Sequence, residues 1–190
     1  MKAKFLARID SRIEQFNRLK EEIAVFAAVE LMETALKKGH RILVFGNGGS
    51  ATQSLHFAAE LVNKFYLERP ALPAIALTGN TANITSIAND SDFKFIFSRQ
   101  VEAIGRENDI ALGISTSGTS ANVIEAFKAA RQKKMKTIAL CGKNTAPLEE
   151  AGVDVVAPVN SGDTPVIQEM HMFYLHFFAE ILEPHCAGNR

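Results

Sequence analysis

The stretch DIALGISTSGTSANVIEAF, residues 109–127, joins a continuous apolar run to a helical pattern through a loop rich in hydroxyl side chains. The apolar part does not alternate with polar residues, which is typical of a strand buried on both faces. The residues after Ser120 place apolar side chains at helical intervals. This stretch therefore predicts a strand, a loop and a helix in succession, which is the repeating unit of a parallel α/β sheet.

The same succession recurs along the chain. Further strands are predicted at four apolar runs: RILVFG (41–46), ALPAIAL (71–77), KTIALCG (136–142) and VDVVAP (153–158). Helical patterns are SLHFAAELVNKF (54–65), ITSIANDSDFKFIFSRQVEAI (84–104), SANVIEAFKAARQKK (120–134) and VIQEMHMFYLHFFAEIL (166–182). This alternation predicts a five-stranded parallel sheet flanked by helices, in a doubly wound, flavodoxin-like α/β fold.

Residues 1–38 predict two helices, because apolar residues recur at helical spacing and Gly39 then ends the second helix. The last helix is apolar nearly all round, so we expect it to be buried by more than its own domain. A homo-oligomer built on the terminal helices follows from both features. We expect one domain over residues 1–190, with an α/β core and last helix at 39–183 and a tail at 184–190 that leaves His185 in solvent.

The composition excludes some partners. The chain has 190 residues, and 21 Lys and Arg balance 21 Asp and Glu, so no overall field favours nucleic acid or an anionic membrane. No apolar run approaches the roughly 20 residues that span a bilayer, and the N-terminus lacks a secretory pattern. Cys141 and Cys186 form no metal or redox spacing, which favours a cytoplasmic protein with Cys141 as a buried thiol at a strand end.

Two loops are expected at the carboxyl edge of the sheet, where α/β proteins bind ligands. The first, FGNGGSATQ (45–53), allows close backbone approach and adds polar side chains through Gly46, Asn47, Gly48, Gly49 and Ser50. It matches neither a P-loop nor a dinucleotide fingerprint. The alternative is a tight strand-to-helix turn with no ligand.

The second loop supplies hydroxyl donors at Ser115, Thr116, Ser117, Thr119 and Ser120. The following helix adds free N–H groups and the positive end of its dipole. A phosphate monoester fits this loop, although it contains no lysine or arginine. The alternative, a helix cap with surplus hydroxyls, explains one or two such residues but not five.

Acid, base and metal candidates lie on two helices. His56 and Glu60 are four residues apart on an otherwise apolar helix, which suits two ligands of one metal or an acid/base pair. Surface pairs of this kind are also common. The last helix carries Gln168, His171 and His176, for which the alternative is a histidine satisfied in the core.

Taken together, the segments GNGGSA, HFAAEL, AIAND, FSRQVEAIGRENDI, GISTSGTSANV and IQEMH resemble the phosphoheptose isomerase family of the sugar isomerase (SIS) domain proteins. The resemblance runs from about residue 5 to residue 183. It implies conversion of sedoheptulose 7-phosphate to D-glycero-D-manno-heptose 7-phosphate, the first step toward ADP-heptose and lipopolysaccharide core. It also implies a homotetramer with sites at subunit interfaces.

The resemblance further implies roles for individual residues, motif by motif. The phosphate would be held by Ser115, Thr116, Ser117 and Ser120. The rest of the substrate would be contacted by Asn47, Gly48, Gly49, Ser50, Glu60, Asn89, Asp90 and Gln168. The acid/base pair would be Glu60 and His176, and the ligands of one zinc ion per subunit would be His56, Glu60, Gln168 and His176.

One pair of the implied zinc ligands is far apart along its helix. Gln168 and His176 are eight residues apart, a rise of about 12 Å on a helix, so they reach one ion only at full stretch or from different subunits. His171 is the competing ligand. The chain also departs from the family pattern at Gln53, Lys64 and Val166, where Asp, Arg and Arg are usual. The loss of planar guanidinium groups leaves the identity of the substrate open.

Two alternative functions are known among proteins of the same superfamily. A non-catalytic SIS protein binds the bacterial replication initiator, and its counterparts of Glu60 and His176 are replaced, whereas both are present here. A sugar-phosphate-sensing regulator would carry a DNA-binding domain, for which we find no residues.

Overall fold

The computed structural model of the chain describes residues 1–186, and for His185 and Cys186 only the backbone. In chain order the elements are α1 (Lys2–Leu19), α2 (Ala24–Lys37), β1 (Ile42–Gly46), α3 (Gly49–Val62), β2 (Ala74–Ala76), α4 (Thr81–Asp90), η1 (Phe93–Phe95), α5 (Ser98–Ile104), β3 (Ile110–Ser115), α6 (Ala121–Gln132), β4 (Lys136–Cys141), α7 (Ala146–Glu150), β5 (Val155–Pro158) and α8 (Thr164–Cys186).

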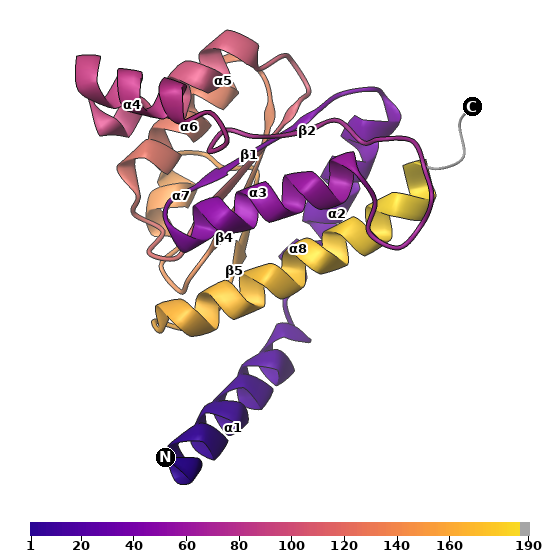
Figure 1. The fold of residues 1–190 in the computed structure, drawn as a ribbon, viewed down its shortest axis with the longest axis vertical. Helices are drawn as coiled ribbons and strands as arrows, with labels where there is room; N and C mark the ends of the chain where they lie inside the picture. The colour runs from indigo at the N-terminus through magenta and orange to yellow at the C-terminus, as the bar shows by residue number, and fades with distance from the viewer. Residues whose placement is uncertain (187–190) are drawn as a thin grey trace.

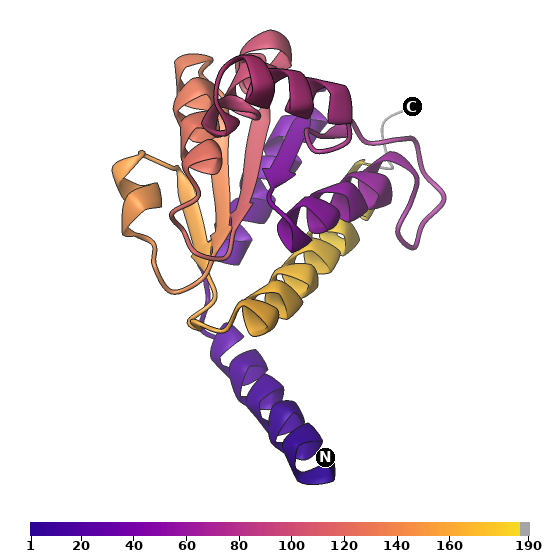
Figure 2. The same cartoon turned by 60° about the vertical axis from the view of Figure 1, so that its left-hand side comes forward.

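The five strands form one parallel sheet in the order β2-β1-β3-β4-β5. This order confirms the predicted doubly wound, flavodoxin-like fold. The direction of winding reverses between β1 and β3, which places a crevice beyond the carboxyl ends of these two strands. Figures 1 and 2 show the helices covering both faces of the sheet.

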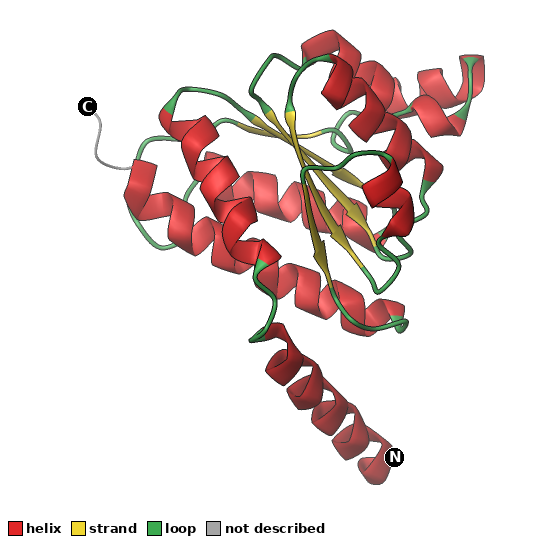
Figure 3. Cartoon of the chain, turned by 180° about the vertical axis from the view of Figure 1, so that it is seen from behind, coloured by secondary structure: helices red, strands yellow, loops and turns green. Residues whose placement is uncertain are grey.

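Alternation along each strand sends side chains into two separate cores. In β1, Ile42 and Val44 pack into the cluster that α2, α3 and α8 share. Leu43 and Phe45 pack on the opposite face, under α5 and α6. Figure 3 shows the sheet between these two layers. Because both faces are covered, most strand positions are buried, and the strands are mainly apolar.

Several boundaries differ from the predictions. The helix predicted at 54–65 is α3, which begins earlier, at Gly49, and ends earlier, at Val62. The pattern at 84–104 is not one helix: it breaks after Asp90, where Ser91 leaves helical geometry and the extended Asp92 caps η1 by accepting from the Lys94 N–H at 2.8 Å. Helix α7 was not predicted. The last helix continues past residue 183 to Cys186, although it contains Pro184. The expected exposure of His185 lies outside the described side chains.

Helix α1 extends away from the body of the molecule in all three views (Figures 1, 2 and 3). It is held to the start of α8 by ion pairs from Arg8 to Asp163 at 3.0 Å and from Arg12 to Glu169 at 2.6 Å. Among residues 1–186 no helix is both long and apolar enough to cross a membrane.

Candidate active site

The two loops singled out in the sequence meet at the crevice. The loop after β1 leads into the N-terminus of α3, and the loop after β3 leads into the N-terminus of α6. Asn47 and Asn122 join them through two reciprocal amide hydrogen bonds of 2.8 Å each. Two helix N-termini therefore lie side by side with free N–H groups, an arrangement that favours an anion.

The hydroxyl loop is ordered by its own hydrogen bonds. The Ser115 hydroxyl donates to the Ser120 hydroxyl at 2.9 Å. The Ser117 hydroxyl accepts from the backbone N–H of Thr119 at 3.2 Å and from the Thr119 hydroxyl at 3.0 Å. Gly118 adopts a left-handed φ of 70°, which closes the turn. Ser117 and Thr119 are exposed, whereas Ser115 and the first-loop residue Ser50 are buried.

The acid/base candidates lie on two neighbouring helices. Helices α3 and α8 run side by side (Figures 1 and 2). Across their contact, the His56 and His176 Nε2 atoms are 2.9 Å apart, so one ring donates to the other. The Glu60 carboxylate is 3.4 Å from the same His56 nitrogen. A carboxylate and two imidazoles thus lie within reach of one another in a partly exposed setting.

His176, and not His171, is the histidine of α8 that lies beside His56. The His171 side chain is fully buried, and its Nε2 lies 3.1 Å from the backbone carbonyl oxygen of Cys141. The ring of Phe65 stacks on the other side of His176, with ring centroids 5.5 Å apart. His176 is therefore held between Phe65 and His56.

Gln168 lies closer to the start of α8 than His176 does, beside Gly49 at the start of α3. A Cβ atom on Gly49 would lie 2.3 Å from the Gln168 Nε2, so the absence of a side chain at Gly49 makes room for this amide. The Gln53 Nε2 donates to the Gln168 backbone oxygen at 2.7 Å, and the buried Gln53 Oε1 has no partner among the described residues. A groove of about 410 Å³ opens here, lined by Gly49, Thr52, Gln53, Pro165, Gln168, Glu169 and Met172.

Asn89 and Asp90 do not join this site within the chain. They lie exposed at the C-terminal end of α4, where the Asn89 side-chain amide donates to the Asp90 carboxylate at 2.7 Å. Asp90 lines a separate hollow with Ser86 and Arg99. The chain fold alone therefore does not bring these two residues to the helix pair that carries Glu60.

The donors suit zinc in kind, since structural and catalytic zinc sites use imidazole and carboxylate ligands. They are not arranged around one point, however. Within residues 1–186 no group of three or more histidine, cysteine, aspartate or glutamate side chains is placed to hold a metal ion. His56 Nε2 faces both His176 and Glu60, while Gln168 lies beside Gly49.

Sequence reasoning missed four residues that shape the site: Asn122, Phe65, Arg69 and Glu183. Asn122 is buried and ties the two loops together. Glu183 could have been recognised from the sequence, because it is a carboxylate in the mainly apolar segment FFAEILEP (177–184) near the end of α8. A charged group in such a segment needs partners if it is buried.

Comparison with known proteins gives one consistent result. Residues 4–142 match the SIS domain family. A phosphoheptose isomerase from Geotalea daltonii is 43% identical over 191 residues, which cover 97% of the chain and 99% of that relative. The solved structure of a phosphoheptose isomerase from Francisella tularensis superimposes with a TM-score of 0.91 at 37% identity, covering 96% of this chain and 97% of that one.

The structure of phosphoheptose isomerase from Neisseria gonorrhoeae gives a TM-score of 0.89 at 37% identity, over 96% of this chain and 98% of that one. Both the fold and the sequence thus match over nearly the whole length. The chain belongs to the SIS domain family and, within it, to the phosphoheptose isomerases.

Proposed function

We propose that the chain interconverts sedoheptulose 7-phosphate and D-glycero-D-manno-heptose 7-phosphate, with Glu60 and His176 as its acid/base pair. The observation that carries the proposal is the placement of Glu60, His56 and His176 on adjoining helices, next to two joined loops that each lead into a helix N-terminus. The product would enter ADP-heptose synthesis for lipopolysaccharide core.

The geometry supports a mechanism for this reaction. Exchange between a ketose and an aldose moves a proton between adjacent carbons through an enediolate. The substrate phosphate would lie at the N-termini of α3 and α6, bound by amides and by the hydroxyls of the Ser115–Ser120 loop. The Glu60 carboxylate would take the proton from carbon, and His176 would exchange a proton with the neighbouring oxygen.

We also propose that zinc is held by His56, Glu60, Gln168 and His176, where it would stabilise negative charge that develops on oxygen. Glu60 cannot be a free base while it binds a cation, so its role changes with metal occupancy. Because Gln168 is about 12 Å along α8 from His176, this set requires side-chain movement or a ligand from another subunit.

A homotetramer with sites at subunit interfaces is part of the proposal. It is supported by the exposed apolar residues of α1 and by the position of Asn89 and Asp90 away from Glu60 within one chain. A second subunit could bring these residues to the site. The cysteine usage supports a cytoplasmic location.

The test is turnover of sedoheptulose 7-phosphate by the purified chain, followed as formation of heptose 7-phosphate with and without zinc chelation. Glu60→Gln and His176→Ala should each lower kcat by about 100-fold or more, since a positioned acid or base contributes about that much. Glu150→Gln, which changes an exposed carboxylate on α7, is the matched control and should behave as wild type.

Lack of turnover by the wild type, both with added zinc and after chelation, would reject this substrate. Binding of the replication initiator would then be tested directly. Full activity in Glu60→Gln would instead reject the assignment of the base and leave the reaction itself standing.

A further inference from the structure

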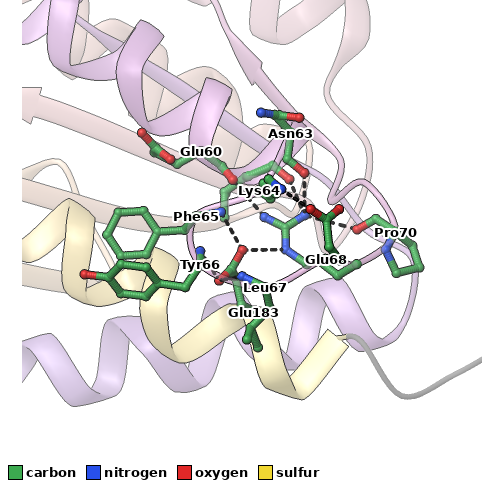
Figure 4. A network of polar contacts seen from close by, with 11 residues as sticks. Glu60, Asn63, Lys64, Phe65, Tyr66, Leu67, Glu68, Pro70 and Glu183 are labelled. Atoms are coloured by element: carbon green, nitrogen blue, oxygen red, sulfur yellow. Dashed lines mark hydrogen bonds and ion pairs between the residues drawn. The ribbon is translucent and has the colours of Figure 1, made fainter.

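Residues 63–73 connect α3 to β2 and contain no helix or strand. A network of polar contacts joins this segment to the end of α8 (Figure 4). A segment of this kind must find partners for its backbone groups. Here they come from two charged side chains, Glu183 on α8 and Arg69 in the segment itself. Both side chains are buried, with exposed fractions of 1% and 0%.

The Glu183 carboxylate accepts three consecutive backbone N–H groups. They belong to Phe65 at 2.5 Å, Tyr66 at 2.7 Å and Leu67 at 3.0 Å. Burial disfavours the ionised carboxylate, but these donors and Arg69 outweigh it, so the pKa of Glu183 lies below its ordinary value. Figure 4 shows the carboxylate facing the turn formed by these residues.

Arg69 completes the pair and binds the end of α3. Its Nε donates to Glu183 at 3.2 Å. Its Nη1 donates to the backbone oxygen of Leu61 at 2.8 Å, and its Nη2 to that of Glu60 at 2.7 Å. These carbonyls belong to the last turn of α3, where a cation is favourable. Arg69 thus fixes the backbone of the residue proposed as the base.

The same network reaches the other half of the acid/base pair. Phe65, whose N–H is bound by Glu183, stacks its ring on His176 at 5.5 Å between centroids. Glu183 lies seven residues after His176, two turns along the same face of α8. Glu183 therefore fixes the loop that supports the His176 ring.

We propose that Glu183 and Arg69 are positioning residues of the isomerase: they set the distance between Glu60 and His176, through the end of α3 and through Phe65, without contacting substrate. The proposal rests on the proposed function for its kinetic part. Its structural part, the placement of His176, is independent of which substrate the protein uses.

The kinetic test compares Glu183→Gln with Asp109→Asn in the full chain. Asp109 is a matched control, because it is also a buried carboxylate that accepts backbone N–H groups (Arg41 at 2.9 Å, Arg106 at 3.0 Å) and an arginine. Its partners lie just before β1 and β3 and not on α3 or α8. We expect both variants to lower the melting temperature. Only Glu183→Gln should lower kcat per folded molecule, by about tenfold or more, since a shift of about 1 Å can cost about 100-fold. KM should stay near the wild-type value, because the phosphate loop is untouched.

A second variant serves if Glu183→Gln does not fold. Phe65→Leu keeps the backbone donors and an apolar side chain but removes the ring that stacks on His176. We expect it to lower kcat. The NMR resonances of the His176 ring, assigned with His176→Ala, should shift in Glu183→Gln, which keeps the Phe65 ring, and should stay in place in Asp109→Asn.

The outcomes separate the two proposals. Wild-type kcat per folded molecule in Glu183→Gln or Phe65→Leu, or unshifted His176 resonances in Glu183→Gln, would overturn the positioning role. Shifted His176 resonances in Glu183→Gln, together with a wild type that turns over no sedoheptulose 7-phosphate, would support positioning while rejecting the proposed reaction.

Discussion

At the scale of single residues, two histidines of the same helix have different surroundings and therefore different properties. His176 lies at the site, whereas His171, five residues earlier on α8, is buried against β4. Burial lowers the pKa of His171 to about 4, with the hydrogen bond to the Cys141 carbonyl opposing it. Cys141 is fully buried at the end of β4, which confirms the interpretation of Cys141 as a buried thiol at a strand end, and burial raises the pKa of this thiol to about 12.

We predict that His171 makes the fold sensitive to mild acid. Its folded pKa of about 4 lies below the ordinary 6.5, so the unfolded chain binds the extra proton first. The stabilisation is complete above pH 6.5 and is lost as the pH falls from 6.5 toward 4. The slope in this window is at most about 1.4 kcal/mol per pH unit.

Urea denaturation at several pH values between neutral and mildly acidic would measure this slope. His171→Gln should show a smaller loss of stability on acidification than wild type, whatever its stability at neutral pH. His40→Gln, in the loop between α2 and β1, is the control for the loss of a histidine elsewhere in the chain. Equal slopes in wild type and His171→Gln would contradict the prediction.

At the scale of elements, the loop between β3 and α6 depends on one glycine. Gly118 has a φ of 70°, and a Cβ there would lie 2.0 Å from the backbone oxygen of Asn144 in the neighbouring loop. The hydroxyls on either side of Gly118 are bonded to one another, so the turn orders the whole group. The glycine is required both by its backbone angle and by the contact.

Gly118→Ala should therefore lower the free energy of unfolding by about 1–3 kcal/mol and raise KM for the sugar phosphate, because the loop must move. The control is Gly162→Ala, since a Cβ there would meet only the Lys143 side chain at 3.6 Å. Denaturation curves and initial rates for both variants would check this. A Gly118→Ala protein with wild-type KM would show that the loop does not hold the phosphate.

At the scale of the whole molecule, α1 leaves an apolar face uncovered. Phe5, Ile9, Ile13 and Phe16 are 65%, 41%, 55% and 41% exposed. Only the C-terminal end of this face is partly covered, where Phe16 meets Phe173 of α8 edge to face at 5.3 Å between ring centroids. So long an apolar stripe on an extended helix favours association of subunits.

We predict that Phe5→Glu combined with Ile9→Glu reduces the mass of the particle in light scattering and, with it, the activity. Lys4→Glu is the control, because it makes the same change in net charge on the same helix without altering the apolar face. An unchanged mass in the double variant would exclude this face as a subunit contact.

The sequence by itself determined the succession of strands and helices, the doubly wound sheet and the two loops at its edge. Each of these depends on local pattern: continuous apolar runs, helical spacing, glycines and hydroxyls before a helix. It did not determine the break at Ser91 or the extension of α8 through Pro184, since capping side chains and tertiary packing decide such ends.

Only the tertiary structure decided which residues share the site. From spacing on α8, both His171 and His176 were candidates for the same ligand position. The packing of α8 on α3 places His176 beside His56, whereas His171 contacts the Cys141 carbonyl. Asn47 and Asn122, which bond each other reciprocally, are 75 positions apart in the sequence. Glu183 and Phe65, whose backbone N–H donates to the Glu183 carboxylate, are 118 positions apart. Partners at such separations are set by how the helices pack on the sheet, and no local pattern encodes that packing.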